Sequence, residues 1–232
     1  MTIIPPPVRR VFESLLDPIV DRLIGSGAHP NLLTTLGTVV AVGSGAAFGL
    51  GQVRAGGLLL LLSGVFDMLD GRVARGGGKI STFGAFYDST LDRIAETGLF
   101  LGIAVFFLRG GLAEPWVVLG VAAAFLALAF GLIVSYARAR AEAVGLECRV
   151  GVFQRAERII GLGAPTLFFA EGPGGFLLLG IVSVLALLSI ITVVQRIRHV
   201  HKITRQEPIT ETVRESREPE PALVRDPKGR EW

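Results

Sequence analysis

Four aspartates lie in two pairs at helical spacing in the first half of the sequence. Asp67 and Asp70 are three residues apart, and Asp88 and Asp92 are four apart, so that each pair shares one face of a helix. The glycine run 76–78 between the pairs permits a tight turn, which would make the two helices antiparallel. We therefore expect the four carboxylates to converge at one depth.

Four negative charges in one place repel each other strongly where the dielectric constant is low. They could be protonated, paired with arginine or neutralised by cations, and two divalent ions would balance four aspartates charge for charge. Oxygen ligands suit Mg²⁺ or Mn²⁺ rather than zinc. Paired metals that clamp a pyrophosphate are a known route to displacement at phosphorus. The pattern therefore predicts a metal site for phosphorus chemistry.

Two other interpretations of the aspartates remain open at this point. They could cap helices or pair with Arg72, Arg75 and Arg93, or they could form the proton or ion relay of a transporter. The helical spacing of all four, with glycines at fixed offsets, favours the metal site.

The elements that must position these residues are membrane helices. The chain has 232 residues, of which half are hydrophobic, and a mean hydropathy of +0.57. Three uncharged runs, 31–53, 115–137 and 172–195, are long enough to cross a bilayer, which takes about 20 residues. Three shorter runs, at 55–66, 97–108 and 159–170, reach that length only if they extend into polar sequence. Those extensions carry the four aspartates and several arginines, so we predict an all-α integral membrane protein with six transmembrane helices.

The segments on either side of this region have a different character. Residues 8–24 place apolar side chains on one stripe of a helix and charges on the other, which indicates an amphipathic helix in the membrane interface. Residues 203–232 are polar and mixed in charge, as in a disordered tail. We expect an N-terminal segment at 1–30, a six-helix domain at 31–202 and a cytoplasmic tail at 203–232.

The placement of the basic residues predicts the orientation. The net charge is +3, but lysines and arginines cluster beside hydrophobic spans, which argues against nucleic acid as a partner. With six spans, nearly all of them fall on one side, and Arg54 and Arg109 alone fall on the other. The positive-inside rule then places both termini and the aspartates on the cytoplasmic side of a multi-pass plasma-membrane protein.

A second group of polar residues lies at later helix ends on the same predicted side. Arginine binds phosphate with two parallel hydrogen bonds, so that several converging arginines suggest a phosphorylated substrate. Anchoring to anionic lipid head groups is the alternative for about half of them. The candidates for phosphate binding among these arginines are Arg138, Arg158 and Arg196.

The aspartate segment resembles the signature of the CDP-alcohol phosphatidyltransferase family. It reads Asp67-Met-Leu-Asp70-Gly71-Arg-Val-Ala74-Arg75 and then Gly84-Ala-Phe-Tyr-Asp88-Ser-Thr-Leu-Asp92. The resemblance implies six transmembrane helices, a homodimer and a cytoplasm-facing site for Mg²⁺ or Mn²⁺ held by the four aspartates, with Asp92 accepting a proton from the incoming hydroxyl. It further implies contacts to CDP-diacylglycerol from Asn31, Leu32, Leu33, Thr34, Asp67, Asp70, Gly71, Ala74, Arg75, Ser81 and Gly84.

The arginine-containing segments are similar to those of phosphatidylinositol phosphate synthases within that family. Arg138 stands where lysine is expected and Gln154 where glutamate is expected. The resemblance implies transfer of a phosphatidyl group from CDP-diacylglycerol to inositol 1-phosphate, with release of CMP, by an enzyme that contacts membrane lipids. It also implies that the acceptor phosphate is bound by Ser135, Arg138, Arg155, Arg158 and Arg196. Glycerol 3-phosphate is the alternative phosphorylated acceptor, and a small secondary transporter is the alternative of another class.

Overall fold

The computed structural model describes residues 6–148, 150–151 and 155–206, and within these ranges it contains helices and no strands. A π-helical turn, Phe107–Gly111, follows α4, and a short 3₁₀ turn, Pro173–Gly175, precedes α7. The α-helices are α1 Pro6–Gly25, α2 Pro30–Gly49, α3 Val53–Gly76, α4 Thr82–Phe106, α5 Val117–Ala143, α6 Arg155–Phe169 and α7 Phe176–Gln206.

The helices agree with the hydrophobic runs of the sequence. Within the described residues, three helices are long and apolar enough to cross a membrane, namely Pro30–Gly49, Val117–Ala143 and Pro173–Arg205, as the three uncharged runs predicted. The shorter runs form α3, α4 and α6, and each helix continues into the expected polar extension. Helix α7 runs past position 203, where the tail was expected to begin, and residues 207–232 lie outside the described part of the chain.

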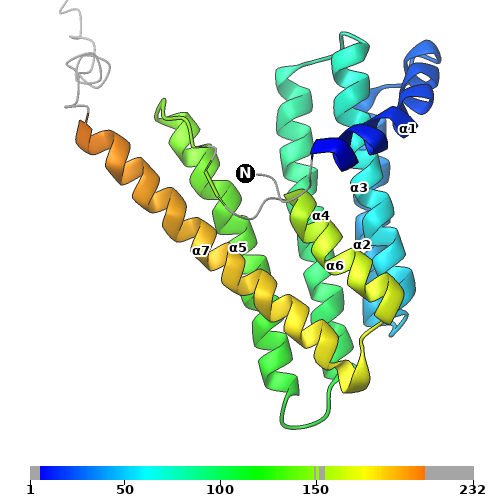
Figure 1. Cartoon of the computed structure of the whole chain (residues 1–232), viewed down its shortest axis with the longest axis vertical. Coiled ribbons are helices and arrows are strands. Elements are labelled where there is room, and N and C mark those ends of the chain that lie inside the picture. Colours follow the sequence, from blue (N-terminus) through cyan, green and yellow to red (C-terminus); the bar gives the residue numbers. More distant parts are fainter. Residues whose placement is uncertain (1–5, 149, 152–154, 207–232) are drawn as a thin grey trace, which may run out of the picture.

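The helices form two groups that meet along α4 and α6. Helix α2 packs between α3 and α4, α6 lies along α3, and α5 and α7 pack on each other and lean away from the first group (Figure 1). Phe48, Ile103, Phe107, Leu178 and Val182 are buried in the core that joins the groups, and all of them are apolar. Burial of these apolar side chains stabilises the contact between the two groups, and this stabilisation does not depend on precise orientation.

Helices α2 and α4 are in direct backbone contact at glycine residues. A Cβ atom at Gly45 would meet the carbonyl group of Gly98, and one at Gly102 would meet the carbonyl of Gly45. Small residues allow membrane helices to pack this closely. The contact fixes the separation of α2 and α4, and both helices carry candidate site residues at their N-terminal ends.

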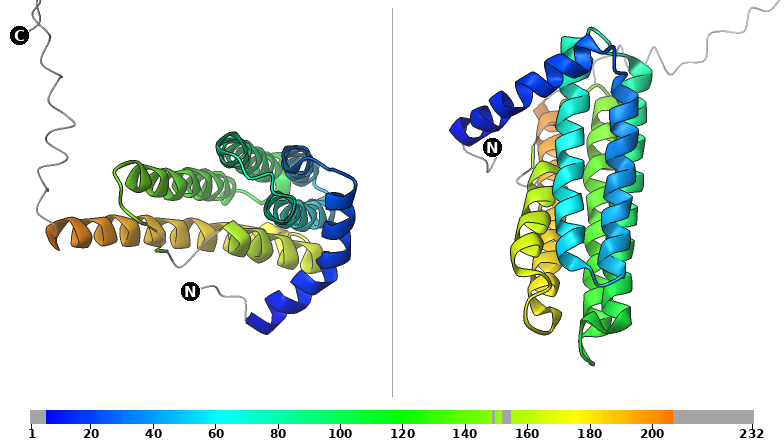
Figure 2. Two further views of the ribbon diagram at one scale, coloured as in Figure 1. Left: turned by 90° about the horizontal axis from the view of Figure 1, so that it is seen from above. Right: turned by 90° about the vertical axis from the view of Figure 1, so that its right-hand side faces the viewer.

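Helix α1 lies across the end of the bundle and not along it (Figure 2). Leu16 and Val20 are buried against α3, whereas Leu15 and Ile19 are 66% and 47% exposed. Asp17 of α1 also forms an ion pair with Arg72 of α3. The helix is therefore attached to α3 near the aspartates and presents a second apolar edge outward.

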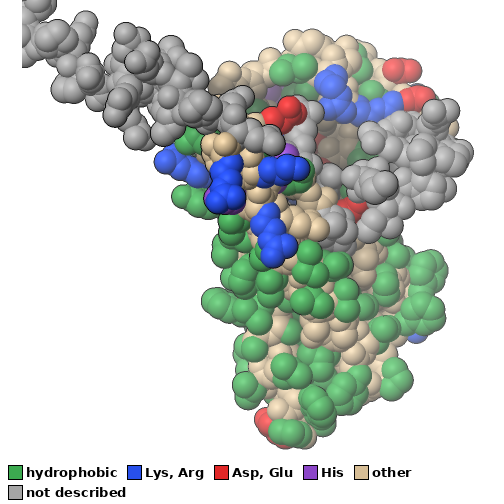
Figure 3. Space-filling view, turned by 60° about the vertical axis from the view of Figure 1, so that its left-hand side comes forward, with side chains coloured by type: hydrophobic (Ala, Val, Ile, Leu, Met, Phe, Trp, Pro, Cys, Tyr) green, Lys and Arg blue, Asp and Glu red, His purple; other side chains and the backbone are tan. Residues whose placement is uncertain are grey.

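Charged and apolar surfaces are separated along the bundle. Lysine and arginine side chains gather toward one end, and hydrophobic side chains cover most of the remaining length on the visible face (Figure 3). The charged end holds the start of α2, α4 and α6 and the end of α3, α5 and α7. The chain direction thus brings every candidate site residue to the same end.

Candidate active site

The carboxylates of Asp67, Asp70 and Asp88 form one cluster. One oxygen of each lies within 4.8 Å of the others, with the first two residues on α3 and the third on α4. Asp70 is 7% exposed, and its Oδ2 atom and Oδ1 of Asp88 are buried without a hydrogen-bond partner. Buried acceptors of this kind need a partner. An oxygen-only donor set with two such atoms fits Mg²⁺ or Mn²⁺.

The turn between α3 and α4 holds the two halves of the cluster together. Gly78 has a positive φ of 64°, which suits glycine, and the Ser81 hydroxyl accepts a hydrogen bond from the Gly84 amide at 3.0 Å to cap α4. The Lys79 ammonium donates to the carbonyls of Gly27 at 2.7 Å and Ala28 at 3.0 Å. The turn is thereby tied to the entry of α2.

Asp92 does not join this cluster, although the sequence predicted that four carboxylates would converge. Its carboxylate forms an ion pair with Arg155 of α6, and the Arg93 guanidinium lies 3.4 Å away. Arg155 also reaches within 3.7 Å of the Asp67 carboxylate. Asp92 lies one helical turn beyond Asp88, and the cationic side chain draws it toward α6 rather than toward α3. Arg155, expected to contact an acceptor phosphate, therefore lies between two of the metal-site candidates.

Residues expected to contact CDP surround the cluster. Thr34 is buried at the start of α2, where its hydroxyl donates to the Pro30 carbonyl at 3.2 Å, and a Cβ atom at Gly84 would lie 3.5 Å from Oδ1 of Asn31. A Cβ atom at Gly71 would lie 3.3 Å from Nη1 of Arg75, so Arg75 folds over this glycine. The first turn of α2 and the facing turns of α3 and α4 thus enclose the cluster.

Leu32 and Leu33, both expected to contact the nucleotide, differ in exposure. Leu33 is 6% exposed and packs in the small apolar cluster under α1, whereas Leu32 is 57% exposed. Ser81 is exposed and Ala74 is half-buried. The side chain of Leu33 is therefore enclosed by protein, whereas that of Leu32 is open to the surroundings.

The remaining phosphate candidates are spread over α5 and α7. Arg138 is exposed and pairs with Glu142 at 2.8 Å on its own helix. Arg196 is buried, and its guanidinium donates to the carbonyls of Val150, at 3.0 Å, and Val134. Ser135 donates to the Gly131 carbonyl at 3.3 Å. These side chains share one end of the bundle, and each has an internal partner.

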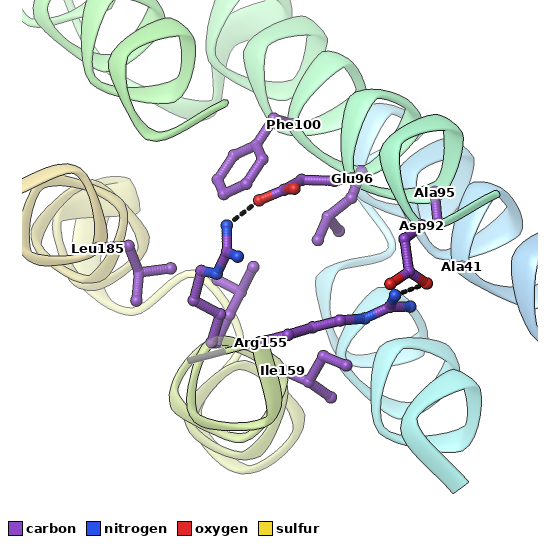
Figure 4. A pocket seen from close by; sticks show the side chains of 11 residues that line it. Ala41, Asp92, Ala95, Glu96, Phe100, Arg155, Ile159 and Leu185 are labelled. Carbon is purple, nitrogen blue, oxygen red and sulfur yellow. Dashed lines mark hydrogen bonds and ion pairs between the residues drawn. The ribbon is translucent and has the colours of Figure 1, made fainter. Parts of the chain in front are cut away.

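A cavity between α4 and α6 is lined by Glu96, which was not among the expected site residues. Arg158 of α6 forms an ion pair with Glu96 of α4, and the two side chains are only 11% and 13% exposed. Leu99, Phe100, Ile159 and Leu185 line the apolar part of this cavity (Figure 4). Glu96 follows Asp92 by four residues, and that spacing was the one sequence signal that placed it on the site-facing side of α4.

Comparison with known proteins identifies this arrangement. The family model of the CDP-alcohol phosphatidyltransferases matches residues 27–195. The archaetidylinositol phosphate synthase of Methanothermobacter thermautotrophicus is 38% identical over 197 residues, which cover 83% of this chain and 91% of the relative.

Solved structures agree with the sequence match. The crystal structure of the Mycobacterium tuberculosis phosphatidylinositol phosphate synthase with bound CDP-DAG superposes with a TM-score of 0.66 at 35% identity, over 79% of this chain and 92% of the other. The same enzyme in complex with manganese and citrate gives a TM-score of 0.67 at 34% identity, over 79% and 87% of the two chains. The family model spans the aspartate pairs, α2 to α6 and most of α7, and the chain is therefore a transferase that belongs to the CDP-alcohol phosphatidyltransferase family.

Proposed function

We propose that this enzyme transfers the phosphatidyl group of CDP-diacylglycerol to inositol 1-phosphate and releases CMP. The observation that carries the proposal is the cluster of Asp67, Asp70 and Asp88, whose buried unpaired oxygens lie beside an arginine-lined cavity. The names of the relatives support the acceptor, because two different relatives are synthases of inositol phosphate lipids.

The cluster and the residues around it form the binding site for the CDP group. Asn31 and Thr34 at the start of α2, with Gly71 and Gly84 on the facing helices, would contact the nucleotide next to the carboxylates. Arg75, above Gly71, can meet phosphate charge. Divalent cations held by Asp67, Asp70 and Asp88, with Asp92 at the edge of the cluster, would offset the charge of the pyrophosphate when bound.

The chemistry needs one proton transfer and one displacement at phosphorus. An acceptor hydroxyl oxygen forms a bond to the phosphorus that carries the diacylglycerol, and the bond from that phosphorus to the CMP oxygen breaks. Asp92 accepts the hydroxyl proton, and its carboxylate is held at the edge of the cavity by Arg155. The protein gains rate mainly by holding the two substrates in position.

The acceptor phosphate binds on the side of the cavity where α5, α6 and α7 end or begin. Ser135, Arg138, Arg155, Arg158 and Arg196 supply hydrogen-bond donors from three helices. Arg196 makes its contacts to backbone carbonyls rather than to a carboxylate, so that its positive charge remains available to a phosphate. A phosphorylated acceptor matches this charge better than an amine such as serine.

The same proposal includes the position of the chain in the membrane. Helices α2 to α7 are six spans of the plasma membrane, with the charged end and both termini in the cytoplasm. Helix α1 lies in the interface, with Leu15 and Ile19 toward the lipid. The six-helix domain occupies residues 31–202 and forms a homodimer.

A panel of acceptors tests the proposal. Purified protein with CDP-diacylglycerol and Mg²⁺ or Mn²⁺ is given inositol 1-phosphate, inositol, glycerol 3-phosphate or serine, and CMP release is measured. We expect inositol 1-phosphate to be used best. Equal use of unphosphorylated inositol would refute the acceptor phosphate site, whereas use of glycerol 3-phosphate alone would keep the site and change the acceptor.

A further inference from the structure

Two ion pairs join α4 and α6 like successive rungs. Asp92 and Glu96 are four residues apart on α4, and Arg155 and Arg158 are three apart on α6, so each pair of like charges shares one helix face. The outer rung joins Asp92 and Arg155, and the inner rung joins Glu96 and Arg158 (Figure 4). The outer rung borders the carboxylate cluster, whereas the inner rung lies deeper in the cavity.

The inner rung is enclosed on its third side by α5. A Cβ atom at Gly131 would meet Nη1 of Arg158 and Oε1 of Glu96, so the pair lies directly against the bare backbone of α5. The carbonyl of this same glycine accepts the hydrogen bond from Ser135, at 3.3 Å. The pair thus lies one helical turn from a residue of the proposed acceptor site.

This environment makes Arg158 dependent on Glu96. The Arg158 side chain is 11% exposed, and its guanidinium pairs with Glu96 through Nη1. A buried charge that loses its partner is strongly destabilised and moves to find another. Besides Glu96, the carboxylate that lines this cavity is Asp92 of the outer rung, so an Arg158 released from Glu96 would turn toward Asp92.

We propose that Glu96 is a positioning residue that holds the Arg158 guanidinium against Gly131, with its other nitrogens directed to the acceptor phosphate. The inference rests on the proposed function, because it takes Arg158 as a phosphate ligand. Glu96 itself does not touch the reacting atoms. Its carboxylate keeps Arg158 away from Asp92, so that the proton acceptor and the phosphate ligand remain separate.

The test compares Glu96→Gln, Gly131→Ala and two matched controls by steady-state kinetics, with each substrate varied in turn. Asp17→Asn breaks an ion pair outside the cavity in the same way, and Gly161→Ala adds a methyl group on α6 where no atom lies within 4 Å. We expect both cavity variants to raise the acceptor KM about tenfold or more, with the KM for CDP-diacylglycerol changed less than about twofold. Both controls should match the wild type.

A double-mutant cycle of Glu96→Gln and Arg158→Gln, measured by thermal unfolding without substrate, tests the pair independently of the reaction. Non-additive changes in Tm are expected, since the two side chains are in contact. Additive changes, or an unchanged acceptor KM in Glu96→Gln when the wild type uses a phosphorylated acceptor, would overturn the inference. Equal use of inositol and inositol 1-phosphate by the wild type would instead refute the proposed acceptor site, and the role of Glu96 would fall with it.

Discussion

Replacement of Gly45 by alanine is expected to force α2 and α4 apart. The added Cβ atom would lie 2.7 Å from the Gly98 carbonyl carbon and 3.0 Å from Cα of Leu99, whereas ordinary contacts begin at 3.4 Å. The atoms that this Cβ would meet belong to the backbone, which cannot rotate away as a flexible side chain can. The Gly98 carbonyl oxygen would lie closer still, so the two helices must separate by more than roughly 0.7 Å at this level, which is the difference between the carbonyl-carbon distance and the ordinary contact distance.

The expected loss of stability in Gly45→Ala follows from the cost of overpacking. An extra methyl group that displaces backbone in a packed interior costs about 1–3 kcal/mol. For a chain of this size the Tm falls by about 2–4 °C per kcal/mol, so we expect a decrease of roughly 2–12 °C. Because α4 carries Asp88 and α2 carries Asn31, the same separation should lower kcat.

Thermal unfolding of the purified protein in detergent, with Gly43→Ala as the matched control, measures this effect. Gly43 lies on the same helix, but an added Cβ atom meets nothing within 4 Å. Alanine favours a helix over glycine by about 1 kcal/mol, so the control is expected to be neutral or stabilising. Equal Tm values for the two variants would refute the argument from close backbone contact.

Three further predictions concern the site and its orientation. Activity is expected to disappear with EDTA and to return with Mg²⁺ or Mn²⁺, and full activity in the chelator would contradict the metal site. Asp92→Asn is expected to lower kcat by about a hundredfold or more, because an amide cannot accept the proton, while Asp17→Asn leaves turnover unchanged. In a Cys148→Ser background, a membrane-impermeant thiol reagent applied to intact cells should label Gln52→Cys but not Ile80→Cys, and labelling of the latter alone would reverse the proposed orientation.

The aspartate cluster could be anticipated because it depends mainly on local geometry. Helical spacing places Asp67 and Asp70 on one face, and the short glycine turn determines which face of the next helix meets them. The long apolar runs likewise predicted α2, α5 and α7, since a membrane-length run leaves few alternatives.

The sequence could not show which charges meet across helices. Arg155 and Asp92 are far apart along the chain, and nothing in their spacing indicates that they pair. The same holds for Glu96 and Arg158, whose contact depends on how α6 lies against α4. Arg196 was expected to point to a phosphate, but its contacts with the carbonyls of Val134 and Val150 depend on the path of the loop between α5 and α6.

Analysis of the lipid product is the most direct test of phosphatidyl transfer to inositol 1-phosphate. Purified enzyme is incubated with CDP-diacylglycerol of known acyl composition, inositol 1-phosphate and Mn²⁺, and the lipid extract is analysed by mass spectrometry while CMP is measured in the same sample. We expect a phosphatidylinositol phosphate with the acyl chains of the donor, formed with one CMP per lipid and absent with Asp70→Asn. A wild-type reaction that releases no CMP, or an Asp70→Asn protein that forms the lipid at the wild-type rate, would refute transfer of a phosphatidyl group at the aspartate cluster.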